Sequence, residues 1–131
     1  MAEQKRLLML VLTLERKQRN DFRVAVTLGW LSHVDRVLGL RREGMRWAEE
    51  ALELFNQLGN SLGQATCLGT LALSLLEDNQ LDAAEDIALR ELGLLPKKGR
   101  EYLLCQSHHL LGIIYRRKGQ KEKAINHSRR P

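Results

Sequence analysis

The chain has 131 residues, of which 44% are hydrophobic, 5% aromatic and 28% charged. A chain of this length usually forms one domain and can bury enough apolar surface for a core. With two cysteines and two prolines, it is neither a disulfide-stapled nor a collagen-like protein. The formal net charge of +5 permits an acidic partner without requiring one. Leucine outnumbers the β-branched residues, which favours helices over strands.

The first segment, residues 2–18, is predicted to form a helix. It contains an apolar run of eight residues, Leu7–Leu14, with Lys5 and Arg6 before it and more charged residues directly after it. A membrane span needs about 20 apolar residues, and no small-residue cleavage site of a signal peptide follows the run. We therefore expect a buried helix of a cytoplasmic protein, with no membrane association.

The rest of the chain repeats itself at a spacing of forty residues, with Ala25, Ala65 and Cys105 as the first position of each unit. Positions four, seven and eleven then lie on one face of a helix. Three further positions carry small or turn-forming residues, which allow close helix approach or a positive φ at a helix end. They are Ser32, Ala72 and Gly112 at position eight, Gly39, Asn79 and Gly119 at position fifteen, and Gly44, Ala84 and Ala124 at position twenty.

This register predicts antiparallel helix pairs that bury their apolar faces by stacking. After the first segment, the helices are expected at Asp21–Leu38, Arg42–Leu58, Ser61–Asp78, Leu81–Leu95, Gly99–Lys118 and Lys121–Arg129. We therefore predict an all-α fold of about seven helices, stacked as a right-handed α-solenoid. The predicted organisation is a single domain over 1–131, with an initial helix (2–18) and units 21–60, 61–98 and 99–131, the last truncated.

The third unit resembles the tetratricopeptide repeat. The residues that carry this resemblance are His108, Leu111, Gly112, Tyr115, Gly119 and Ala124. The forty-residue unit, and segments such as DFRVAVTLGWLSHVDRVLGL, are similar to tetratricopeptide arrays of mushroom-forming fungi. The resemblance implies a concave groove that the first helices line. Because the sequence has no catalytic cluster, we expect this groove to bind a protein or peptide partner, with no cofactor and no catalysis.

The groove positions that this resemblance implies carry polar and apolar residues in all three units. The candidate groove residues are His33, Arg36, Leu73, Glu77, Gln106, His109, Ile113, Arg116 and Arg117. Arg36, Arg116 and Arg117 could pair with carboxylates of a partner. The alternative is that these arginines are ordinary solvated surface charges.

Other chemistry is weakly indicated. Cys105 and His108 have the i, i+3 spacing of zinc ligands, but no fourth ligand has a convincing spacing, and both are expected to be buried packing residues. Cys67 is expected inside as well, so we predict no metal site and no catalytic cysteine. The basic stretch from Arg116 to Arg130 could bind phosphates, but it lacks stacking aromatic residues.

The favoured function is therefore a non-catalytic protein–protein interaction scaffold. The alternative is a helical-repeat protein that binds nucleic acid through the basic third unit, and we regard nucleic-acid binding as the weaker hypothesis. The apolar initial helix and the truncated last unit predict a homodimer. We also expect Gly44→Ala to be neutral or stabilising, because the matching positions carry alanine.

Overall fold

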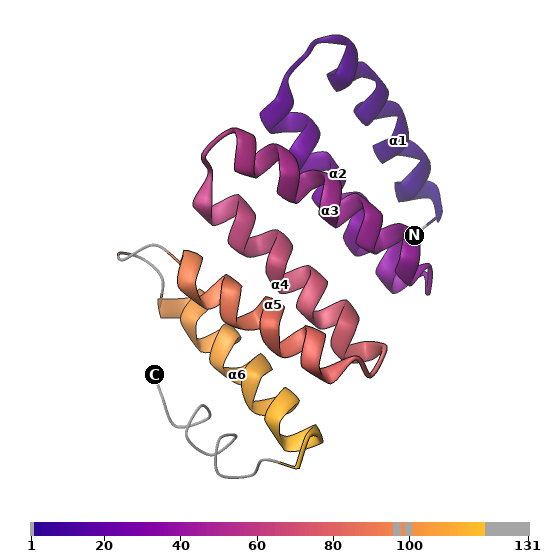
Figure 1. Ribbon diagram of the computed structural model, residues 1–131. Coiled ribbons are helices and arrows are strands. Elements are labelled where there is room, and N and C mark those ends of the chain that lie inside the picture. Colours follow the sequence, from indigo (N-terminus) through magenta and orange to yellow (C-terminus); the bar gives the residue numbers. More distant parts are fainter. Residues whose placement is uncertain (1, 96–97, 99–100, 120–131) are drawn as a thin grey trace.

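The structure is a computed structural model in which residues 2–95, 98 and 101–119 are described. These residues form six α-helices that follow one another along a stack, with α1 at one end and α6 at the other (Figure 1). The helices are α1 (Ala2–Lys17), α2 (Asp21–Val37), α3 (Arg41–Gln57), α4 (Ser61–Glu77), α5 (Leu81–Leu94) and α6 (Glu101–Arg117). The predicted all-α fold class is confirmed. The expected helix Lys121–Arg129 lies outside the described residues, as does Ala124.

A turn of the same geometry follows α1, α2, α3, α4 and α6, whereas α5 ends at Leu95 in an extended conformation. The second residue after the helix has a positive φ at Arg19 (57°), Gly39 (83°), Gly59 (68°), Asn79 (59°) and Gly119 (80°). The positive φ expected at position fifteen is thus confirmed, and the chain uses the same device between units as well. Because α2 to α6 begin at residues 21, 41, 61, 81 and 101, the forty-residue repeat consists of two twenty-residue halves.

Asparagine side chains start the first helices of two units. The Asn20 side chain accepts a hydrogen bond from the Arg23 amide at 3.2 Å, and the Asn60 side chain accepts one from the Gly63 amide at 2.8 Å. These bonds satisfy amides that have no partner within the helix. Asp21 lies in the first turn of α2, where its charge is favourable near the helix N-terminus.

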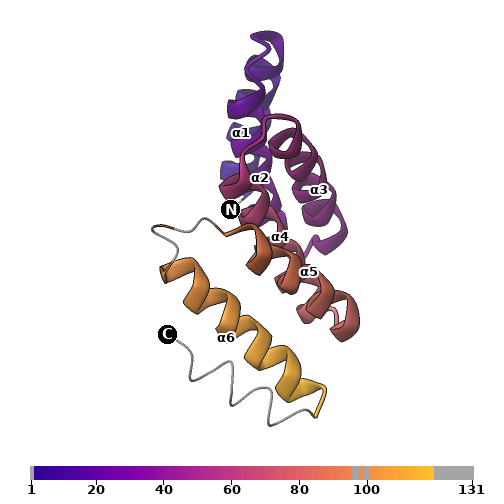
Figure 2. The ribbon, with the colours of Figure 1, turned by 60° about the vertical axis from the view of Figure 1, so that its left-hand side comes forward.

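The core forms two clusters of buried residues along the stack. One lies among α1, α2, α3 and α4, where Leu12 and Leu28 are fully enclosed. The other lies among α4, α5 and α6, and includes Ala84, Leu111 and Ile114. Figure 2, turned by 60° from Figure 1, also shows α1 and α6 at opposite ends of the stack. Each helix therefore contributes apolar residues to its neighbours, as the repeat pattern requires.

The contact between α2 and α3 is closer than the sequence indicates. A Cβ atom at Gly44 would lie 2.9 Å from the Ser32 carbonyl oxygen and 3.3 Å from the Arg36 amide nitrogen. Both atoms belong to the backbone, so a methyl group there would force the two helices apart. The expectation that Gly44→Ala is neutral or stabilising is therefore contradicted, although Gly44 does lie within a helix.

A buried carboxylate links the first three helices. Asp35 of α2 is 0% exposed. Its Oδ1 lies 2.9 Å from Lys5 Nζ of α1, and its Oδ2 accepts a hydrogen bond from Trp47 Nε1 of α3 at 2.8 Å. A buried carboxylate is costly unless it is paired and hydrogen-bonded. The matching positions of the other two units carry Leu75 and Tyr115, so an ion pair replaces apolar packing at Asp35.

Two further polar contacts hold α1. The Thr27 hydroxyl of α2 donates a hydrogen bond to Glu15 Oε1 at 2.5 Å, and Arg16 forms an ion pair with Glu50 of α3. Leu12 is the fully buried residue of this helix. The helix is thus attached by polar contacts along its length and by a narrow apolar stripe.

A lysine joins the end of α6 to the start of α5. Lys118 Nζ lies 2.8 Å from Asp82 Oδ1 and 2.7 Å from Glu85 Oε1. The hydrogen bond and the charge of Lys118 hold the pKa of Asp82 below its usual value, and both carboxylates raise the pKa of Lys118. Burial raises the pKa of the neighbouring Tyr115 to about 12, so its hydroxyl keeps its proton at neutral pH.

Candidate binding surface on the first helices

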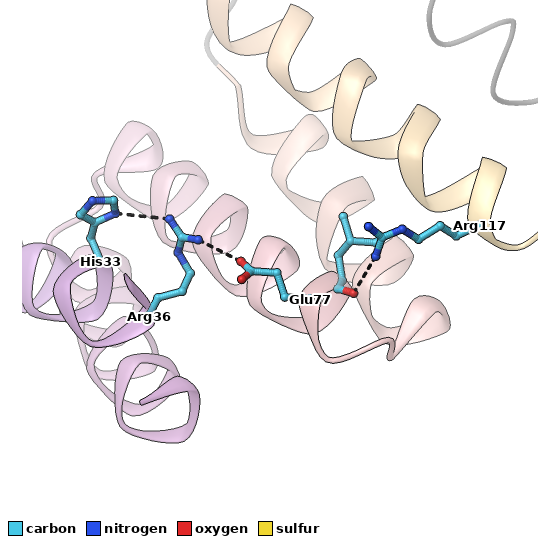
Figure 3. A network of polar contacts seen from close by, with 5 residues as sticks. His33, Arg36, Glu77 and Arg117 are labelled. Atoms are coloured by element: carbon cyan, nitrogen blue, oxygen red, sulfur yellow. Dashed lines mark hydrogen bonds and ion pairs between the residues drawn. The ribbon is translucent and has the colours of Figure 1, made fainter. Parts of the chain in front are cut away.

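The C-terminal halves of the first helices α2, α4 and α6 carry a row of linked polar residues. Arg36 Nη1 donates a hydrogen bond to Glu77 Oε1 at 2.9 Å, which joins α2 to α4 (Figure 3). His33 Nδ1 lies 3.5 Å from Arg36 Nη2. On the other side of α4, Arg117 Nη1 donates to the Leu76 carbonyl oxygen at 3.2 Å (Figure 3). Two of the three candidate arginines therefore bind acceptors of their own chain.

The remaining candidate groove residues divide between surface and packing. His109 and Arg116 are exposed on α6, and the Gln106 amide there donates to the Tyr102 hydroxyl at 3.1 Å. Leu73 and Ile113 are only partly exposed, because they pack against the core cluster of α4, α5 and α6. The polar row thus cross-links neighbouring helices, while Leu73 and Ile113 contribute mainly to packing.

An apolar pocket of about 460 Å³ lies between α2 and α4, with α3 at its base. Four large side chains on its rim are at least one-third exposed, and Trp30 is the most open of them at 59%. They are Phe22, Val26, Trp30 and Leu62. A pocket of this size with a few polar groups is typical of sites that accept an apolar group of a ligand or partner. We call the pocket and its rim the α2–α4 pocket.

Small residues and satisfied hydroxyls create this pocket. Gly29 has no side chain, and a Cβ atom there would meet nothing within 4 Å. The Thr66 and Thr70 hydroxyls donate to carbonyl oxygens of their own helix, at 3.0 and 3.2 Å. At one end, the rings of Phe22 and Phe55 pack edge to face, with their centroids 6.2 Å apart. The walls therefore present apolar surface with few open hydrogen-bonding groups.

Phe22, Trp30 and Leu62 are not among the groove residues predicted from the sequence. A signal was nevertheless present, because Phe22, Leu62 and Tyr102 are large residues spaced by forty, and all three are exposed. A large apolar residue that recurs at an exposed position of each first helix indicates a surface rather than a core. Most of the groove residues that the resemblance implies belong to the polar row of His33, Arg36, Glu77 and Arg117 or lie near it, and not to this apolar surface.

The cysteines and histidines of the described part differ in burial and in chemical environment. Burial raises the pKa of the Cys67 thiol to about 11, which keeps it protonated and unreactive. His108 is buried, as expected, but Cys105 is exposed, contrary to expectation. The matching Ala25 lies in a core cluster that includes Ala51 and Phe55 of α3, the second helix of its own unit. The second helix of the third unit was expected over residues outside the described part. Within the described ranges, no three His, Cys, Asp or Glu residues gather around a possible ion.

The basic third unit is only partly within the described chain. Arg117 binds the Leu76 carbonyl oxygen, and Lys118 binds Asp82 and Glu85. The basic residues after position 119 lie outside the described part. Arg117 and Lys118 are therefore already engaged with acceptors of their own chain. This weakens the alternative that they bind the phosphates of a nucleic acid.

Stacked antiparallel helix pairs with close small-residue contacts define an all-α helical-repeat fold, an α-solenoid. Among solved structures, the chain is similar to the crystal structure of BtubC (BKLC) from P. vanneervenii, with a TM-score of 0.85 and 21% sequence identity. The match covers 94% of this chain and 52% of that one, so the chain spans about half the length of BtubC. No family model matches the sequence, and no curated protein was found to be similar to it. Of the helices described, none is long and apolar enough to cross a membrane.

Proposed function

We propose that the chain is a non-catalytic scaffold that binds another protein or a peptide through the exposed face of its first helices. The observation that carries this proposal is the α2–α4 pocket, with Trp30 and its other exposed apolar rim residues. Soluble proteins seldom expose a contiguous apolar surface without a partner for it. A tetratricopeptide-like fold supports a protein partner in general terms.

The pocket suggests how a partner would bind. One large apolar side chain of the partner would enter between α2 and α4, where aromatic anchors are effective because they bury much area. His33 and Arg36 lie beside the pocket and would face residues that flank this anchor. Because Arg36 already binds Glu77, its contribution to a partner's carboxylate would require that bond to be shared or broken.

A selection experiment tests this proposal. A random peptide library would be selected against the immobilised chain, and the affinities of enriched peptides would be measured for the wild type and two variants. Gly29→Leu places a side chain in the pocket, whereas Gly93→Leu adds the same side chain in open space on α5. Both changes raise helix propensity, so they differ mainly in their effect on the pocket.

We expect peptides with a shared large apolar residue, and at least tenfold weaker binding to Gly29→Leu with no change for Gly93→Leu. Equal binding to all three proteins, or no enrichment, would contradict the proposal. Binding of a non-specific oligonucleotide with a steep salt dependence would instead support the nucleic-acid alternative.

In this proposal the scaffold works in the cytoplasm of a fungal cell, as the sequence resemblance suggests, and it self-associates.

A further inference from the structure

The face of α1 that does not pack on the core cluster is apolar and open. Leu7, Leu10 and Leu14 are 55%, 59% and 58% exposed, and they recur at the i, i+3, i+7 spacing of one helical stripe. Glu3 and Lys17 extend this stripe at its two ends and are also exposed. A stripe of this kind on a well-formed helix requires a partner surface.

In the forty-residue register, two leucines of this stripe correspond to packing residues of α3. Leu7 and Leu14 align with Trp47 and Leu54 of α3. Both of those residues are partly buried against the core cluster that α3 forms with α2. Leu7 and Leu14 therefore occupy packing positions, but α1 has no preceding helix to pack against within the described chain.

Leu10 is different, because its position faces solvent in the other helices. It aligns with Glu50 of α3 and Arg90 of α5, which are both exposed. A missing helix pair would account for Leu7 and Leu14 but not for a leucine at this position. The stripe is thus wider than stacking of one more repeat unit would need.

We propose that α1 packs in an antiparallel arrangement against α1 of a second copy of this chain, about a two-fold axis close to Leu10. Antiparallel pairing about this point sets Leu10 beside the partner's Leu10 and Leu7 within one residue of the partner's Leu14. It also sets Glu3 beside the partner's Lys17, twice by symmetry. The stripe is therefore complementary to itself in the spacing of its leucines and in its end charges, and this self-complementarity favours a second copy over an unrelated protein.

The surface next to the stripe enlarges the contact. A second hollow, of about 530 Å³, lies between α1 and α2 and is lined by Leu7, Leu8 and Trp30 among others. A single helix pair buries less area than most stable dimers. We therefore expect a weak dimer in exchange with monomer. The inference rests on the self-association in the proposed function. The leucine stripe of α1 lies outside the α2–α4 pocket, although the hollow beside the stripe shares Trp30 and His33 with that pocket.

Sedimentation equilibrium over a wide concentration range, at low and high salt, tests the pairing. Leu10→Glu should weaken the dimer at least tenfold, while Leu89→Glu, at an exposed leucine of α5, should leave it unchanged. Glu3→Lys and Lys17→Glu should each weaken it about threefold or more at low salt, because each places like charges together. The double variant should restore the dimer, although both changes oppose the α1 helix dipole.

A monomer at all concentrations would overturn the inference. So would a mass that grows beyond the dimer, which would indicate head-to-tail stacking of chains, or a double variant as weak as the single ones. Peptide binding at the α2–α4 pocket, measured with Gly29→Leu, does not depend on these results. Failure of the dimer and failure of the binding function are therefore distinguishable.

Discussion

Gly44→Ala tests how closely α2 and α3 approach. In an open helix, replacing glycine with alanine gains about 0.5–1 kcal/mol. Here the new methyl carbon would lie 2.9 Å from the Ser32 carbonyl oxygen, closer than Cβ atoms come to other atoms. Because the obstacle is backbone, relief requires the helices to separate, and overpacking of this kind costs about 1–3 kcal/mol. We expect a net loss of about 1–2 kcal/mol, since the steric cost exceeds the propensity gain.

The matched control is Gly29→Ala, in the middle of α2, where a Cβ atom meets nothing within 4 Å. It should stabilise the chain by about 0.5–1 kcal/mol. Urea unfolding gives both free energies of unfolding, and the corresponding shifts in Tm are about 3–6 °C for each kcal/mol in a chain of this size. If Gly44→Ala is as stabilising as Gly29→Ala, the two helices are not in backbone contact at this position.

Three further changes test the core and its buried charges. Ala84→Leu should cost about 1–3 kcal/mol or more, because Ala84 is fully buried between helices; wild-type thermal stability would contradict the packing. Lys5→Met should cost about 3 kcal/mol in urea unfolding, because it leaves Asp35 buried without its cation; a loss below 1 kcal/mol would mean that the pair is solvated. Burial raises the pKa of the Glu91 carboxyl, despite its hydrogen bond from Ser107. The folded state therefore binds this proton more tightly than the unfolded state does, and the free energy of unfolding should fall as pH rises through that pKa. Glu91→Gln should remove this dependence and be at least as stable at pH 7; an unchanged pH profile would contradict the assignment.

The helix arrangement was predictable because its signals are local and repeated. Gly39 and Asn79 mark turns that require a positive φ, and the structure has that φ at both. Helices α2 to α5 begin within one residue of the predicted positions. Spacing alone reveals such features, because each depends on the residue itself and on its immediate neighbours in the chain.

The binding surface was less predictable because it depends on which side chains meet across helices. Arg36 and Arg117 look like free cations in the sequence, yet their acceptors lie 41 residues away along the chain. Gly44 looks like a weak helix residue until the position of Ser32 is known. Trp30 is not among the predicted groove residues, because the exposure of its side chain depends on the neighbouring helices and cannot be read from periodicity.

The twenty-residue spacing of the helices has a consequence for how the chain could change length. Removing residues 21–60 would join Asn20 to Ser61, so that α1 would be followed directly by α4. The turn between them would keep the positive φ of Arg19, as the turn before α4 now has a positive φ at Gly59. Excision or duplication of forty residues preserves the register of the turns and of the helix faces, although removal of 21–60 would cost α1 its polar partners Thr27, Asp35 and Glu50. One residue added inside a helix instead turns all later side chains of that helix by about 100° about its axis. The array can therefore gain or lose whole modules far more readily than single residues, and its span is adjustable in steps of one helix pair.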